Sequence, residues 1–197
     1  MKRICVFCGS SAGARPEYLE AAAELGQCLA RKGVGLVYGG GRVGMMGKIA
    51  ATVIDCGGDV IGVIPEDLAR REVAFSDLPD LHIVDSMHAR KALMVELSDG
   101  FILLPGGLGT MEEFFEMLTW GQLGIHKKPC GLMDVQGYFG KLVDLVAHTV
   151  AEKFVDKENL SVILMNESPQ ELLRQFENYR PPAVDKAKWT LQMANAG

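Results

Sequence analysis

The amino-acid sequence predicts a doubly wound α/β fold, in which helices cover both faces of a parallel sheet. Short apolar runs rich in β-branched residues alternate with longer segments of helical periodicity. Most of these short runs are apolar throughout, which is typical of strands buried on both faces. The chain has 197 residues, 48% of them hydrophobic, which is the size and composition of a single domain.

The predicted elements follow one another in a regular order. The strands are expected at residues 3–7, 35–38, 59–64, 81–84, 101–104, 130–133 and 162–164. The helices between them are expected at residues 16–32, 45–56, 87–98, 110–121 and 138–154. A last helix begins after Ser168, because a capping serine, Pro169 and Glu171 form a helix-start signal. Two prolines after Arg180 end it, so we expect a domain over residues 1–179 and a tail over 180–197.

Composition excludes several classes of partner. The net charge of -5 lacks the basic surface of a general nucleic-acid or anionic-membrane binder. No apolar run approaches the roughly 20 residues that span a bilayer. Five scattered cysteines, an odd number, indicate a reducing compartment. We therefore expect a cytoplasmic protein with neither a nucleic-acid nor a membrane partner.

Glycine-rich turns follow three predicted strands, at residues 8–11, 39–44 and 105–110. Ligands of open parallel sheets bind beyond the carboxyl ends of the strands. Glycine lets the backbone approach a ligand closely, and a helix that begins there favours an anion. Each turn alone is more simply interpreted as a tight connection, but three at one sheet edge favour phosphate or nucleotide binding.

Two nucleotide-binding motifs fit poorly. Gly39, Gly41 and Gly44 match the dinucleotide pattern G-x-G-x-x-G, but the acidic residue that binds the ribose is not at the end of the next strand. The pair Gly47-Lys48 is followed by isoleucine, where a nucleoside-triphosphate loop requires serine or threonine.

Charged residues beside the turns have two interpretations each. Thr110 and Glu113 match a capping box, whereas Glu112 and Glu113 beside an anion-binding loop suit a cationic, ribosyl-like transition state. Arg90 and Lys91 form either a solvated helix face or a phosphate grip, with Arg90 bidentate and Lys91 a second charge.

A metal site is not expected. Cys5 and Cys8 have an odd separation within a strand, which places their thiols on opposite faces. The four histidines are dispersed along the chain.

Two motifs carry a family resemblance. Residues 105–113 read PGGLGTMEE, and residues 87–91 read MHARK. Together they resemble the LOG ("lonely guy") family of cytokinin riboside 5′-monophosphate phosphoribohydrolases, whose members are often labelled lysine decarboxylases. The resemblance implies a Rossmann-like homodimer that hydrolyses the N-glycosidic bond of adenine-type nucleoside 5′-monophosphates without a cofactor.

The resemblance also implies roles for individual residues. Arg90 and Glu113 match the catalytic pair. The substrate-binding positions are Glu72, Lys91, Gly106, Gly107, Gly109, Thr110 and Glu112, of which the four from Gly106 to Thr110 match the phosphate-binding loop. Two alternatives stay open: a nucleosidase that accepts plain AMP, and a nucleotide-binding module without catalytic activity.

Overall fold

The computed structural model describes residues 1–70 and 74–181. In this part of the chain, seven parallel strands form one sheet in the order β4-β3-β2-β1-β5-β6-β7. The strands are β1 (Arg3–Phe7), β2 (Gly35–Tyr38), β3 (Val60–Pro65), β4 (Leu81–Val84), β5 (Phe101–Leu103), β6 (Cys130–Met133) and β7 (Ile163–Asn166). The predicted doubly wound parallel fold is confirmed.

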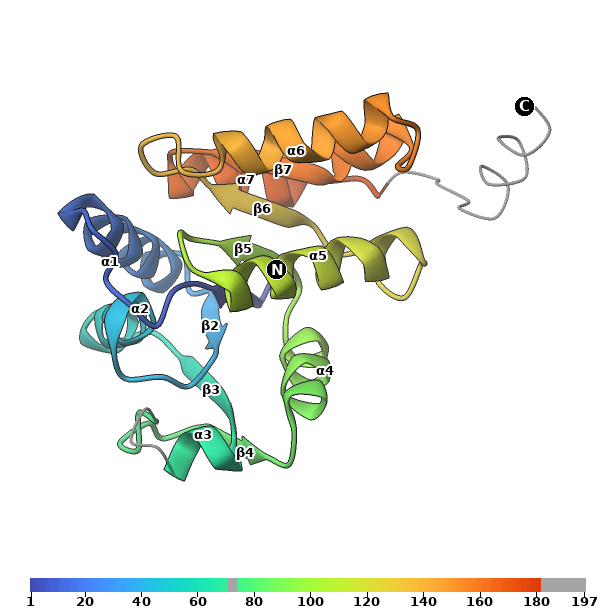
Figure 1. Cartoon of the computed structure of the whole chain (residues 1–197). Helices are drawn as coiled ribbons and strands as arrows, with labels where there is room; N and C mark the ends of the chain where they lie inside the picture. The colour runs from blue at the N-terminus through green and yellow to red at the C-terminus, as the bar shows by residue number, and fades with distance from the viewer. Residues whose placement is uncertain (71–73, 182–197) are drawn as a thin grey trace.

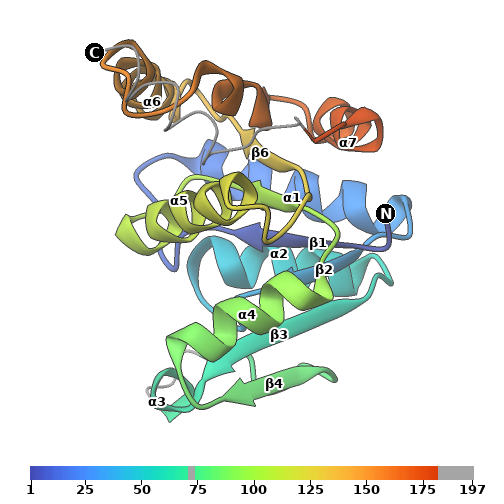
Figure 2. The ribbon, with the colours of Figure 1, turned by 90° about the vertical axis from the view of Figure 1, so that its right-hand side faces the viewer.

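Helices cover both faces of this sheet (Figures 1 and 2). One face is covered by α1 (Pro16–Arg31), α2 (Gly44–Asp55) and α7 (Pro169–Asn178), and the other by α4 (Met87–Leu97), α5 (Leu108–Gln122) and α6 (Gly140–Ala151). Each layer buries its own apolar cluster, with Leu25 and Leu172 on the first side and Met94 and Phe114 on the second. Among the described helices, none combines the length and the apolar character needed to cross a membrane.

The strands agree with the sequence prediction better than the connections do. Cys5 and Cys8 lie in the clusters on opposite faces, as predicted. The last strand is Ile163–Asn166 instead of residues 162–164. A short α3 (Glu66–Leu68) and the 3-10 helix η2 (Lys157–Val162) were not predicted, because so few residues show no periodicity.

The chain reverses its direction of travel across the sheet beside β1. It proceeds outward from β1 to β4, then returns to place β5 on the other side of β1. The loops that follow β1 and β5 touch, since the Gly9 amide donates a hydrogen bond to the Pro105 carbonyl at 3.1 Å. Such a switch point opens a crevice at the carboxyl ends of the two strands, where ligands bind in folds of this kind.

Candidate active site

A cleft of about 460 Å³ lies at this crevice. All three glycine-rich loops line it, through residues such as Gly9, Gly41 and Gly109. The prediction that these loops meet at one sheet edge is therefore confirmed. Arg90, Glu112 and Glu113 are the charged residues among those that line the cleft.

The start of α5 forms one wall. The helix begins at Leu108, with Gly107 as its N-cap and no side-chain cap. The amides of residues 107–110 have no acceptor within the helix, because the first intrahelical bond runs from Met111 to Gly107. These amides and the helix dipole favour an anion at this wall.

The capping box predicted for Thr110 and Glu113 is wrong. Leu108 and Gly109 are already helical, so Thr110 stands at the third helical position, where it is only 4% exposed. The sequence suggested a later start because glycine has a low helix propensity. Glu113 is therefore the sixth residue of α5, in its second turn, and its carboxylate does not cap the helix.

Arg90, from the first turn of α4, lines the cleft with only 8% of its surface exposed. Its Nε donates to the Val63 carbonyl at 3.1 Å, and its Nη1 lies 3.6 Å from Glu113 Oε1. A β-carbon at Gly39 would collide with Nη2 of this guanidinium, so the glycine leaves room for it. The interpretation of Arg90 as part of a solvated helix face is wrong.

Glu113 has an unusual environment for a carboxyl group. It is 7% exposed, and burial raises its pKa to about 7, although the charge of Arg90 opposes this shift. Glu112 and Glu116 add to the increase in pKa. Both protonation states are therefore populated at neutral pH, which suits a group that exchanges a proton or stabilises a nearby positive charge.

Lys91 faces α5 and is 5% exposed. Its Nζ lies 2.5 Å from Glu112 Oε1 and 2.9 Å from Glu116 Oε2. Burial lowers the pKa of Lys91, but the pairing of its ammonium group with these two carboxylates outweighs burial, and the net pKa is raised. The structure thus places Lys91 as a link between α4 and α5, and its predicted contact with substrate stays a prediction.

The remaining predicted residues are distributed around the cleft. Gly107, Gly109 and Thr110 line it, whereas Gly106 lines a neighbouring cavity of about 280 Å³. Glu72 lies outside the described residues. No cluster of three metal-ligating side chains occurs within residues 1–70 and 74–181.

Sequence reasoning missed two features of the site. One is Glu116, whose spacing of four residues from Glu112 places both on one helix face and was the available signal. The other is an apolar wall from separate elements, formed by Val43, Met46, Ile64, Leu68 and Met87. No local pattern in the sequence indicates such a wall, because only the fold brings these elements together.

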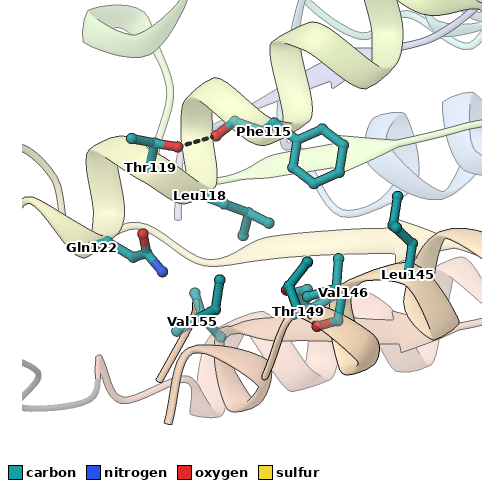
Figure 3. Close-up of a pocket in the computed structure, with 10 residues that line it drawn as sticks. Phe115, Leu118, Thr119, Gln122, Leu145, Val146, Thr149 and Val155 are labelled. Atoms are coloured by element: carbon teal, nitrogen blue, oxygen red, sulfur yellow. Dashed lines mark hydrogen bonds between the residues drawn. The ribbon is translucent and has the colours of Figure 1, made fainter. Parts of the chain in front are cut away.

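A second cavity, of about 310 Å³, lies between α5 and α6. Figure 3 shows Phe115 and Leu118 of α5 facing Leu145 and Val146 of α6 across it. The residues that line it carry no charge, and Phe115 and Leu145 are 40% and 53% exposed. The groove is therefore an apolar surface, chemically distinct from the cleft.

Comparisons with known proteins agree with this geometry. The family model described as "Possible lysine decarboxylase" matches residues 46–176. The chain is 51% identical over 177 residues to the probable cytokinin riboside 5′-monophosphate phosphoribohydrolase LOGL1 of Oryza sativa subsp. japonica, covering 90% of this chain and 79% of that protein. It is 45% identical over 194 residues to cytokinin riboside 5′-monophosphate phosphoribohydrolase LOG1 of Arabidopsis thaliana, covering 97% and 91%.

Solved structures share the fold at lower identity. The molybdenum cofactor binding protein of Rippkaea orientalis is 22% identical with a TM-score of 0.67, covering 90% of this chain and 97% of that one. The molybdenum cofactor carrier protein of Chlamydomonas reinhardtii is also 22% identical, with a TM-score of 0.66 over 90% and 99%. These two likenesses concern the fold alone. The family model and the two plant relatives show that the chain belongs to the LOG family.

Proposed function

We propose that the protein hydrolyses the N-glycosidic bond of N6-modified adenine nucleoside 5′-monophosphates, releasing the free base and ribose 5-phosphate. The names of its relatives support this activity. The observation that carries it is the buried pair of Arg90 and Glu113, 3.6 Å apart, beside the uncapped start of α5. A carboxylate, a fixed cation and a phosphate-binding helix start are the groups that this reaction requires.

The chemistry follows from where charge develops. Cleavage leaves positive charge on the ribose ring and negative charge on the departing base. The amides of residues 107–110 bind the 5′-phosphate, which fixes the sugar in the cleft. Glu113 stabilises the ribosyl cation and accepts a proton from the water whose oxygen bonds to the ribose, and this proton then passes to the departing base. Arg90 offsets negative charge on the phosphate or the base.

The apolar wall favours a base with an apolar N6 substituent over plain AMP. Met46, Ile64, Leu68 and Met87 offer side chains against which a short hydrocarbon chain loses contact with water. Plain AMP, which lacks this substituent, buries less apolar surface against these side chains. We therefore expect N6-modified nucleotides to be better substrates than AMP.

Turnover assays with four substrates test the function. Purified protein is incubated with N6-isopentenyl-AMP, AMP and the two matching nucleosides, and the free base is measured by chromatography. Both nucleotides are expected to be hydrolysed, the modified one faster, with little release from the nucleosides. Equal rates on nucleosides and nucleotides would contradict the role of the phosphate, and binding without turnover would identify a non-catalytic module.

We also propose that the protein is a homodimer. The apolar groove between α5 and α6, with Phe115 and Leu145 exposed at its rim, supports a second copy as the partner. A charge placed in the groove by Leu145→Glu is expected to convert the dimer to a monomer in analytical ultracentrifugation. A wild-type monomer at micromolar concentration would refute the proposal.

We further propose a cytoplasmic location and no nucleic-acid or membrane partner. All five cysteines lie within the described residues, all are free, and four are buried. Free thiols fit a reducing compartment. Fractionation of the native host with detection of this chain tests the location.

A further inference from the structure

Tyr138 lies behind the phosphate-binding loop, in the turn between β6 and α6. Its hydroxyl donates a hydrogen bond to the Gly106 carbonyl at 2.6 Å, across 32 residues of sequence. This is a contact between a side chain and the backbone of the loop that the proposed function assigns to the phosphate. Nothing in the motif that contains Gly106 indicates it.

The Tyr138 ring is held in place from two sides. It makes edge-to-face contacts with Tyr18 of α1, at 5.7 Å between ring centroids, and with Phe139, at 5.1 Å. The turn itself is fixed by Asp134, whose carboxylate accepts the Phe139 amide at 2.9 Å. The hydroxyl therefore reaches Gly106 from a rigid support.

Gly106 is also closely packed in the direction of its missing side chain. A β-carbon there would collide with the Thr110 hydroxyl and would come within 2.8 Å of the Gly9 amide nitrogen. The Tyr138 hydroxyl adds a hydrogen bond to the Gly106 carbonyl, which holds the orientation of the peptide plane between Gly106 and Gly107.

That plane determines where an amide points. In a trans peptide the carbonyl of one residue and the N–H of the next point in opposite directions. With the Gly106 carbonyl turned toward Tyr138, the Gly107 N–H is turned away from it. Tyr138 lines the smaller cavity, and Gly107 stands between that cavity and the cleft.

We propose that Tyr138 is a positioning residue for phosphate: by holding the Gly106 carbonyl, it directs the Gly107 N–H into the cleft, toward the ligand's phosphate group. The inference rests on the proposed function for the identity of the ligand. It assigns to Tyr138 an effect on the phosphate of the substrate and none on the cleavage step, which Arg90 and Glu113 carry out.

The test compares Tyr138→Phe with Tyr18→Phe, which also removes a hydroxyl from the same ring pair. Calorimetry measures the Kd of ribose 5-phosphate, kinetics measure kcat and KM on N6-isopentenyl-AMP, and thermal unfolding measures Tm. Loss of one hydrogen bond is expected to weaken ribose 5-phosphate binding and raise KM about 5- to 10-fold in Tyr138→Phe, with kcat within about threefold. Tyr18→Phe is expected to match the wild type.

Each contrary outcome has a distinct meaning. Unchanged Kd in Tyr138→Phe, or an equal loss in Tyr18→Phe, would overturn the inference. A fall in kcat together with a lower Tm and an unchanged Kd would also overturn it, since that pattern marks a purely structural residue. If the wild type binds ribose 5-phosphate but hydrolyses no nucleotide, the proposed function fails while the Kd comparison still tests Tyr138. A wild type that binds no ribose 5-phosphate refutes the phosphate-positioning role.

Discussion

Glu113→Gln is expected to make the protein inactive and, at alkaline pH, more stable. The ordinary pKa of a glutamate is 4.5, and in the folded protein that of Glu113 is raised to about 7, first of all by burial. At about 1.4 kcal/mol per pKa unit, ionising this carboxyl group in the folded state costs about 3 kcal/mol more than in the unfolded chain. Glutamine resembles the protonated form and avoids that cost.

The raised pKa of Glu113 makes the stability of the folded protein depend on pH. Between pH 4.5 and 7 the folded protein holds a proton on Glu113 that the unfolded chain has lost, so wild-type stability decreases as the pH rises through this window. The variant lacks this decrease. The two proteins should differ by about 3 kcal/mol at pH 8, in favour of Glu113→Gln, and by much less at pH 5.

Urea unfolding of both proteins at pH 5 and pH 8 measures this difference. The matched control is Glu112→Gln, because the Glu112 side chain is 55% exposed and pairs with Lys91, so that its neutralisation brings no gain at pH 8. Turnover of Glu113→Gln is expected to decrease by about 10²-fold or more. A variant that is active, or one that is no more stable than the wild type at pH 8, would refute the reasoning.

Three further predictions follow from the same site. Gly39→Ala should displace the Arg90 guanidinium and lower kcat/KM at least about 10-fold. The control Gly140→Ala, which has open space around its β-carbon, should leave kcat/KM unchanged. Equal kcat/KM values for the two variants would show that Arg90 moves without consequence. Lys91→Met leaves two partly exposed carboxylates without their shared cation and should lower the free energy of unfolding by about 1 kcal/mol in urea titrations. A variant as stable as the wild type would mean that the link between α4 and α5 is weak. Turnover should persist after dialysis against EDTA, since the assigned chemistry needs only side chains and amides; activity restored by a divalent cation would disprove this.

The sequence was informative where one local signal determines the structure. Continuous apolar runs located the strands, because burial on both faces of a parallel sheet leaves no room for alternation. The start of α5 was misplaced because Gly107 and Gly109 have low helix propensity, and the tertiary fold outweighs propensity at a helix end. The fold, by bringing α4 against α5, determines that Lys91 meets Glu116, and no spacing along the chain encodes that meeting.

The placement of β1 in the sheet has a consequence for synthesis of the chain. β1 is translated before the other six described strands, yet it pairs with both β2 and β5, and its second neighbour begins only at Phe101. The loops that line the cleft follow β1, β2 and β5, and the hydroxyl that contacts the Gly106 carbonyl belongs to Tyr138. A nascent chain can therefore build the sheet from β1 to β4 early, but it gains a complete nucleotide site only after Tyr138 has been translated.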